Sequence, residues 1–192
     1  MRSDLERVLF DESAIHQRLN DIAAQISEHY RDCELTVVAV LHGSLMFVAD
    51  LLRRIPLPLK LECLSVASYH GKTQTSGNVI FKPVPAGPSS GGEVILPDVA
   101  GRDVLVLDDI LDTGQTLAVI RGALEAMKPR SIKICVLLSK RKQRTREVDL
   151  DYVGFEIEDE FVVGYGLDFR EHYRNLPYIG VLRKEFLEGS NK

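Results

Sequence analysis

The sequence predicts an α/β protein with a twisted, mostly parallel sheet flanked by helices. Short, continuous apolar runs recur along the chain, as is typical of strands buried on both faces. Between several of them, apolar residues are spaced three and four apart, which indicates amphipathic helices. Because strands and helices alternate, parallel strands joined by right-handed crossovers are favoured.

Length and composition suit one globular domain spanning residues 1–192. The hydrophobic fraction of 45% is close to the globular average, so a full core can form. No internal repeat or linker divides the chain. The formal net charge of -4 gives no general attraction to nucleic acid or to an anionic membrane.

The cysteines and the first residues indicate a cellular compartment. Cys33, Cys63 and Cys135 are odd in number and lack metal-ligand spacing, so we expect free thiols and a reducing environment. The first twelve residues are too charged for a signal peptide, and no apolar run approaches the length of a membrane span. We therefore expect a cytoplasmic protein.

The first third of the chain alternates between helix and strand. A helix is predicted over 11–30, where Asp11 or Ser13 can cap its start. The following elements are a strand at 35–41, a helix at 45–54 ended by Pro56 and Pro58, and a strand at 61–68.

Residues 69–98 differ from the rest in being rich in glycine and proline. They predict a long mobile loop with a ragged hairpin around NVIF and EVIL. Strand and helix then resume. The expected elements are a strand at 103–108, a helix around 117–127, a strand at 131–139, and short strands in YVGFEI, FVVGY and YIGVL.

The stretch VLVLDDILDTGQTL, residues 104–117, carries the most chemical information. A buried strand ends in Asp108 and Asp109, and a turn with Asp112 leads into a helix. The unpaired N–H groups and the dipole of a helix N-terminus attract an anion such as phosphate. Carboxylates beside a phosphate need another ligand, and sugar hydroxyls or Mg²⁺ fit. The pattern therefore suggests a phosphorylated sugar as ligand.

Two other interpretations of this stretch remain. VLVLDD also resembles the acidic strand end of a phosphorylation receiver domain, although there the acidic pair normally lies near the start of the chain. A strand that ends in Asp before a capped helix can also be purely structural. The match to the whole pattern D-D-x-x-D-T-G-x-T favours the binding site.

DDILDTGQTL resembles the phosphoribosyl-pyrophosphate signature of the type I phosphoribosyltransferases. LHGS, SYHGKTQTSG, LLSKR and EFVVGYGLDFREHYRNLPYIGV are similar to the hypoxanthine-guanine branch and occur in its order. The resemblance implies the family fold, with a small hood and a lid loop over 69–98. It also implies transfer of a phosphoribosyl group from phosphoribosyl pyrophosphate to N9 of a 6-oxopurine, with Mg²⁺ as cofactor.

The resemblance also implies roles for individual residues. Asp112 faces N7 as candidate general base, Lys140 reads the 6-oxygen, Phe161 stacks on the base and Val162 offers backbone contacts. Asp168 corresponds to a Mg²⁺ ligand. The resemblance assigns the ribose hydroxyls to Asp108 and Asp109, and the 5′-phosphate to Thr113, Gly114, Gln115 and Thr116. It assigns the pyrophosphate to Leu41, His42, Gly43 and Arg174. The lid is implied to start at Ser68 and Tyr69.

These assignments have simpler alternatives. Phe161 suits plain core, Lys140 suits a solvated basic loop, and Asp168 with Arg174 suits a surface ion pair. His42 stands where the family is expected to have lysine, and imidazole is only partly charged near neutral pH. In this family the pyrophosphate loop, here Leu41, His42 and Gly43, often has a non-proline cis peptide bond.

Other functions and the assembly state remain open. Xanthine is an alternative base, and a phosphoribosyltransferase-like RNA-binding regulator is an alternative of another class, which the net acidity disfavours. By resemblance we expect a homodimer or homotetramer that binds phosphoribosyl pyrophosphate and a 6-oxopurine.

Overall fold

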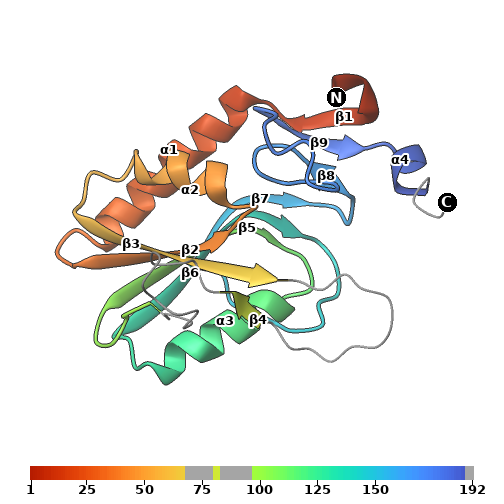
Figure 1. Cartoon of the computed structure of the whole chain (residues 1–192). Helices are drawn as coiled ribbons and strands as arrows, with labels where there is room; N and C mark the ends of the chain where they lie inside the picture. Colours follow the sequence, from red (N-terminus) through yellow and green to blue (C-terminus); the bar gives the residue numbers. More distant parts are fainter. Residues whose placement is uncertain (68–79, 83–96, 189–192) are drawn as a thin grey trace, which may run out of the picture.

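The computed structural model describes residues 1–67, 80–82 and 97–188 and is built around a six-stranded twisted sheet (Figure 1). Five of the strands are parallel, and the short edge strand β4 runs antiparallel to β3. In spatial order the strands are β4 (Ile80–Lys82), β3 (Leu59–Ala67), β2 (Leu35–Leu41), β5 (Asp103–Leu111), β6 (Ser131–Lys140) and β7 (Tyr152–Ile157).

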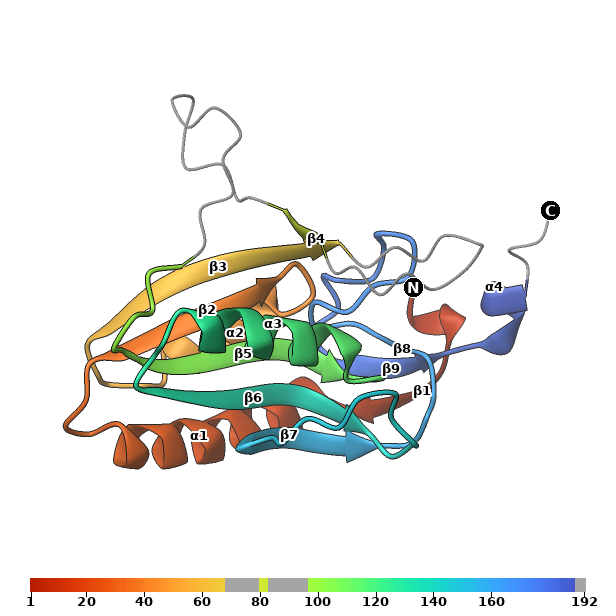
Figure 2. The same ribbon diagram turned by 90° about the horizontal axis from the view of Figure 1, so that it is seen from below.

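Helices cover both faces of this sheet (Figure 2). Helices α1 (Glu12–His29) and α2 (Leu45–Leu52) pack on one face, and α3 (Gln115–Ala126) packs on the other. Alternate residues of β5 point to opposite faces, so Leu105 and Leu107 join the cluster under α1 and α2 while Val104 and Val106 join the one under α3. The fold class predicted from the sequence is confirmed.

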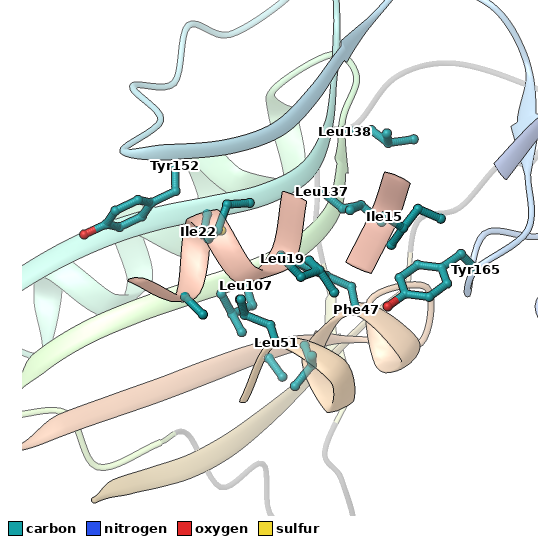
Figure 3. Close-up of a cluster of buried hydrophobic side chains, with 14 of the residues drawn as sticks. Ile15, Leu19, Ile22, Phe47, Leu51, Leu107, Leu137, Leu138, Tyr152 and Tyr165 are labelled. Carbon is teal, nitrogen blue, oxygen red and sulfur yellow. The ribbon is translucent and has the colours of Figure 1, made fainter. Parts of the chain in front are cut away.

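Helix α1 has the cap and the buried apolar stripe that its sequence predicts. Asp11 caps the helix by accepting a hydrogen bond of 2.8 Å from the backbone N–H of Ala14. Figure 3 shows side chains from α1, α2 and the sheet meeting in one cluster. The residues that α1 buries are the expected apolar stripe, Ile15, Leu19, Ile22, Ala23 and Ile26.

A second, smaller sheet joins the two ends of the described chain (Figure 1). Its antiparallel strands, in the order β1-β9-β8, are β1 (Leu5–Phe10), β9 (Ile179–Leu182) and β8 (Val162–Val163). This sheet forms the expected hood. The sequence did not predict β1, the preceding 3-10 turn (Arg2–Asp4) or the last helix α4 (Lys184–Glu188).

One sequence expectation needs correction, and another falls largely outside the described residues. The acids Asp108 and Asp109 lie inside β5, not at its end, because β5 continues to pair with β6 as far as Leu111 opposite Ser139. Of the two segments of the expected hairpin, the described end of NVIF lies in β4, which pairs with β3, and EVIL lies outside the described residues. Most of the proposed lid, 69–98, also lies outside them.

Two further expectations can be compared with the structure. The three cysteines are free thiols; Cys135 is buried, Cys63 half-buried and Cys33 exposed. Among the residues described, no helix has the length and apolarity to cross a membrane.

Candidate active site

The candidate residues gather at the carboxyl edge of the parallel sheet. The loops after β2, β5 and β6 leave from this edge, where open α/β sheets bind their ligands. The hood strand β8 and the loop that follows it lie over the same edge (Figure 2). Residues that are far apart in the sequence therefore form one site.

Asp108, which is buried, and Asp109, which is half-buried, form an adjacent acidic pair. Oδ1 of Asp108 accepts a hydrogen bond of 3.0 Å from the backbone N–H of Asp109, whose own Oδ1 accepts one of 2.8 Å from Ile110. Burial raises the pKa of Asp108 well above its usual range, and the charge of Asp109 adds to this. Burial also raises the pKa of Asp109, while Arg174 acts in the opposite direction.

Gly114 shapes the loop that is expected to bind the 5′-phosphate. Its φ of 80° is the left-handed conformation that favours glycine, and it directly precedes α3. A side chain there would overlap the carbonyl group of Arg146. The first N–H groups of α3 lack partners within the helix, so Gln115 and Thr116 present an anion-binding end.

The loop after β6 docks on this phosphate loop. The backbone N–H groups of Thr145 and Arg146 donate hydrogen bonds of 3.0 and 3.1 Å to the carbonyl oxygen of Thr113. Sequence reasoning left this basic segment as a possible solvated loop. In the structure its backbone is hydrogen-bonded to the turn before α3.

The expected pyrophosphate loop follows β2. The resemblance implied a non-proline cis peptide bond in this loop, and the bond between Leu41 and His42 is cis. The His42 side chain is exposed. A side chain at Gly43 would overlap the carboxylate of Asp109, and one at Gly166 would overlap the carbonyl group of Gly43. This loop is thus packed between the acidic pair and the segment after the hood.

Lys140 is the last residue of β6 and is only 9% exposed, so it is not part of a solvated loop. Its ammonium group lies 3.0 Å from Oδ1 of Asp159 and 3.5 Å from Oδ2 of Asp112. Lys142 pairs with the same two carboxylates. The sequence analysis missed Asp159 and Lys142, although they lie two residues from Phe161 and Lys140.

Phe161 is exposed, which contradicts the alternative that it is plain core. It is 40% exposed, and its ring meets the Phe169 ring edge to face at a centroid distance of 5.5 Å. Its free ring surface suits stacking against a flat ligand. Val162 is buried and holds the strand in register by pairing with Val181.

Asp168 and Arg174 form a half-buried ion pair of 2.9 Å. Arg174 also donates a hydrogen bond of 2.9 Å to the carbonyl oxygen of Gly166, and Asp168 accepts one of 2.9 Å from the N–H of Glu171. These bonds fix both side chains within one loop. They are more than a loose surface pair, because they link this loop to the pyrophosphate loop through Gly166.

The site fits Mg²⁺ in the way this ion usually binds to phosphate-binding enzymes. In the described ranges 1–67, 80–82 and 97–188, no group of three or more His, Cys, Asp or Glu residues could hold a metal. Mg²⁺ commonly uses one or two carboxylates together with water and substrate phosphates. The half-exposed carboxylate of Asp168 meets that need.

Most of the sequence-derived site residues meet at this edge. Asp109, Gly43, Gly166 and Arg174 form one connected group, and Asp112 joins Lys140 in another. Ser68 and Tyr69 lie outside the described residues.

Known proteins share the sequence and the architecture of this chain. The model of the phosphoribosyl transferase domain matches residues 8–170. A hypoxanthine-guanine phosphoribosyltransferase from Staphylococcus epidermidis is 44% identical over 186 residues, covering 96% of this chain and 98% of that protein. A Staphylococcus aureus protein of that name is 41% identical with the same coverage.

Solved structures agree. A hypoxanthine phosphoribosyltransferase from Staphylococcus aureus superimposes with a TM-score of 0.86 at 40% identity, over 97% of this chain and 96% of that one. A hypoxanthine phosphoribosyl transferase from Trypanosoma cruzi gives 0.84 at 33% identity, over 96% and 95%. With its fold, its acidic β5 and the matched domain model, the chain belongs to the phosphoribosyltransferase family.

Proposed function

We propose that the protein is a purine-salvage enzyme that transfers the 5-phosphoribosyl group of phosphoribosyl pyrophosphate to N9 of hypoxanthine or guanine. The products are IMP or GMP and pyrophosphate. The observation that carries this proposal is the placement of Lys140 beside Asp112, with 3.5 Å between ammonium and carboxylate. A 6-oxopurine has its acceptor O6 and its N7 on one edge, so adjacent donor and acceptor groups can read both.

The sugar and phosphates occupy the rest of the sheet edge in this proposal. Asp108 and Asp109 accept hydrogen bonds from the ribose hydroxyls. Their raised pKa values favour a shared proton, which limits repulsion toward the nearby phosphates. The 5′-phosphate binds at the N-terminus of α3, where hydroxyl and backbone donors come from Thr113, Gly114, Gln115 and Thr116.

The leaving pyrophosphate lies between the two loops that meet at Gly43 and Gly166. Backbone groups of Leu41, His42 and Gly43 contact it, and Arg174 supplies a fixed cation. Asp168 would hold Mg²⁺ together with substrate oxygens and water, and the ion would neutralise charge on the departing pyrophosphate.

The chain's own groups then act on the base. Phe161 stacks on the purine ring, and Val162 contacts the base edge through its backbone. Lys140 donates to the 6-oxygen. Asp112 accepts or shares the N7 proton as N9 bonds to the ribose carbon, so that no positive charge is left on the purine.

The remaining parts of the proposal concern organisation. The chain acts as one domain in the cytoplasm, as a homodimer or homotetramer, and segment 69–98 closes as a lid beginning at Ser68 and Tyr69. A lid would exclude water, which could otherwise intercept the oxocarbenium-like ribose carbon.

The direct test is an assay of the purified protein with phosphoribosyl pyrophosphate, Mg²⁺ and one base at a time, followed by ultraviolet absorbance. We expect nucleotide formation with hypoxanthine and guanine, and near-silence with adenine. A clear preference for xanthine would move the function to that base. Activity with none of the purines would overturn the proposal.

A further inference from the structure

Lys142 lies between the two carboxylates that also bind Lys140. Its ammonium group forms an ion pair with Oδ1 of Asp112 and lies 3.1 Å from Oδ1 of Asp159. Lys140 approaches the same carboxylates at 3.5 and 3.0 Å. Two cations and two anions therefore alternate in one closed network.

The network joins three separate segments of the site. Asp112 begins the turn between β5 and α3, Lys142 belongs to the loop after β6, and Asp159 lies between β7 and β8. The basic residue directly before Lys142, Arg141, forms ion pairs with Glu156 and Glu158 instead. The position of Lys142 is thus specific, and is not a property of the basic run as a whole.

The electrostatics agree with a charged network. The interaction with Asp112 raises the pKa of Lys142, and pairing with Asp159 acts in the same direction. The hydrogen bonds from Lys140 and Lys142 hold the pKa of Asp159 below its usual value. Both results favour the ionised forms near neutral pH.

In the proposed reaction, Lys140 must also donate a hydrogen bond to the base. An ammonium group has three donors, and the 6-oxygen of the base requires one of them. With Lys142 present, Asp112 has its own cation and Asp159 aims Lys140. Without Lys142, one ammonium would face two carboxylates and be drawn between them.

We propose that Lys142 is a positioning residue for Asp112, which keeps this carboxylate in place and leaves Lys140 a donor for the 6-oxopurine. The proposal rests on the proposed function and deepens it. In this proposal Lys142 and Asp159 also contribute to purine recognition. They act through their contacts with Asp112 and Lys140.

The test compares Lys142→Met with Arg141→Met, which removes an equal charge from the neighbouring position. We expect kcat with hypoxanthine to fall by up to about a hundredfold in Lys142→Met, the cost of misplacing a reacting group by about 1 Å. The KM for phosphoribosyl pyrophosphate should be unchanged. Arg141→Met should behave as wild type, and Lys142→Arg should recover most of kcat because it retains a cation.

A double-mutant cycle separates positioning from a general effect on folding. In an Asp112→Asn background, Lys142→Met should have little further effect on kcat, since it acts through Asp112. An unchanged kcat in Lys142→Met, or the same fold loss in both backgrounds, would overturn the inference alone. An inactive wild type would overturn the proposed function, and this inference with it.

Discussion

The hydroxyl group of Tyr165 donates a hydrogen bond of 2.5 Å to Oδ2 of Asp50, which joins the loop after β8 to helix α2. Tyr165 is only 5% exposed, and burial together with Asp50 raises the pKa of its hydroxyl. Three residues further on, the same loop carries Asp168, which pairs with Arg174. The hydrogen bond therefore anchors the proposed Mg²⁺ and pyrophosphate loop to the core.

Replacing Tyr165 by phenylalanine should loosen this loop. We expect Tyr165→Phe to lose about 1.5–3 kcal/mol in the free energy of unfolding, the range for hydrogen bonds to charged groups. The KM for phosphoribosyl pyrophosphate should also rise. Urea unfolding and steady-state kinetics measure the two effects.

Tyr30→Phe is the matched control for that change. Tyr30 is as deeply buried, but within the described part of the chain its hydroxyl has no hydrogen-bond partner. Its removal should cost no stability and leave KM unchanged. Equal losses in the two variants would show that the bond to Asp50 has no special role.

Asp112→Asn should act on the chemical step. The substitution keeps the shape of the side chain and removes its ability to take the N7 proton. We expect kcat to fall by about 10²–10⁴-fold, the usual contribution of an acid–base group. Single-turnover measurements that show chemistry to be rate-limiting, with kcat unchanged, would remove Asp112 from the mechanism.

The acidic pair in β5 should make stability depend on pH. The pKa of Asp108 is raised in the folded protein, so the folded state binds more protons than the unfolded state between the ordinary aspartate pKa of 3.8 and the raised pKa of the folded state. The contribution of this residue to the free energy of unfolding is therefore lost as the pH rises through that interval.

Asp108→Asn isolates this contribution, because the amide keeps the oxygen that accepts from Asp109. We expect the stability of the variant relative to wild type to increase as the pH rises above the usual range of a carboxyl group. Urea unfolding at several pH values gives the difference. A difference that is constant with pH, or that decreases, would contradict the raised pKa.

Local patterns in the sequence predicted most of the fold. The run LTVVAVL is apolar except for Thr36 because β2 is buried on both faces. The 15, 19, 22, 26 spacing marks the buried stripe of α1. Strand β1, LERVLF, escaped prediction because it is partly exposed and charged. Its pairing partner β9 lies at the other end of the chain.

The site was predictable where its residues are adjacent in the sequence. DDILDTGQT contains the acids and the phosphate loop in one stretch. The contact of Lys142 with Asp159 and the packing of Gly43 on Asp109 depend on which strands are neighbours in the sheet. Spacing along the chain carries no such information.

His42 permits a test of charge in the pyrophosphate loop. Its exposed imidazole stands where lysine was expected, and imidazole side chains lose their proton across the physiological range. We expect pyrophosphate affinity to weaken more steeply with rising pH in wild type than in His42→Lys. Calorimetric titration measures both, and protonation of the ligand itself cancels in the comparison. Identical profiles would assign the contact to backbone amides.

Lys140 provides the test of base choice. Its buried ammonium group is aimed by Asp159 and offers only donors. The 6-oxo group of hypoxanthine accepts from it, whereas adenine places a 6-amino donor there. Closing the site on adenine would leave the ammonium without that partner, which is costly in a buried position.

Sites built around a required hydrogen bond reject mismatched analogues by roughly 10⁴-fold or more, so kcat/KM for adenine should fall by this order relative to hypoxanthine. Phe161 cannot supply the discrimination, because every purine presents a flat face to its ring. Lys140→Ala should lose activity with 6-oxopurines while retaining affinity for phosphoribosyl pyrophosphate, since the phosphate loop and Arg174 lie elsewhere. Parallel kinetics and calorimetry on this variant measure both properties. Comparable kcat/KM for adenine and hypoxanthine in wild type would remove Lys140 from base recognition and point to a different purine specificity.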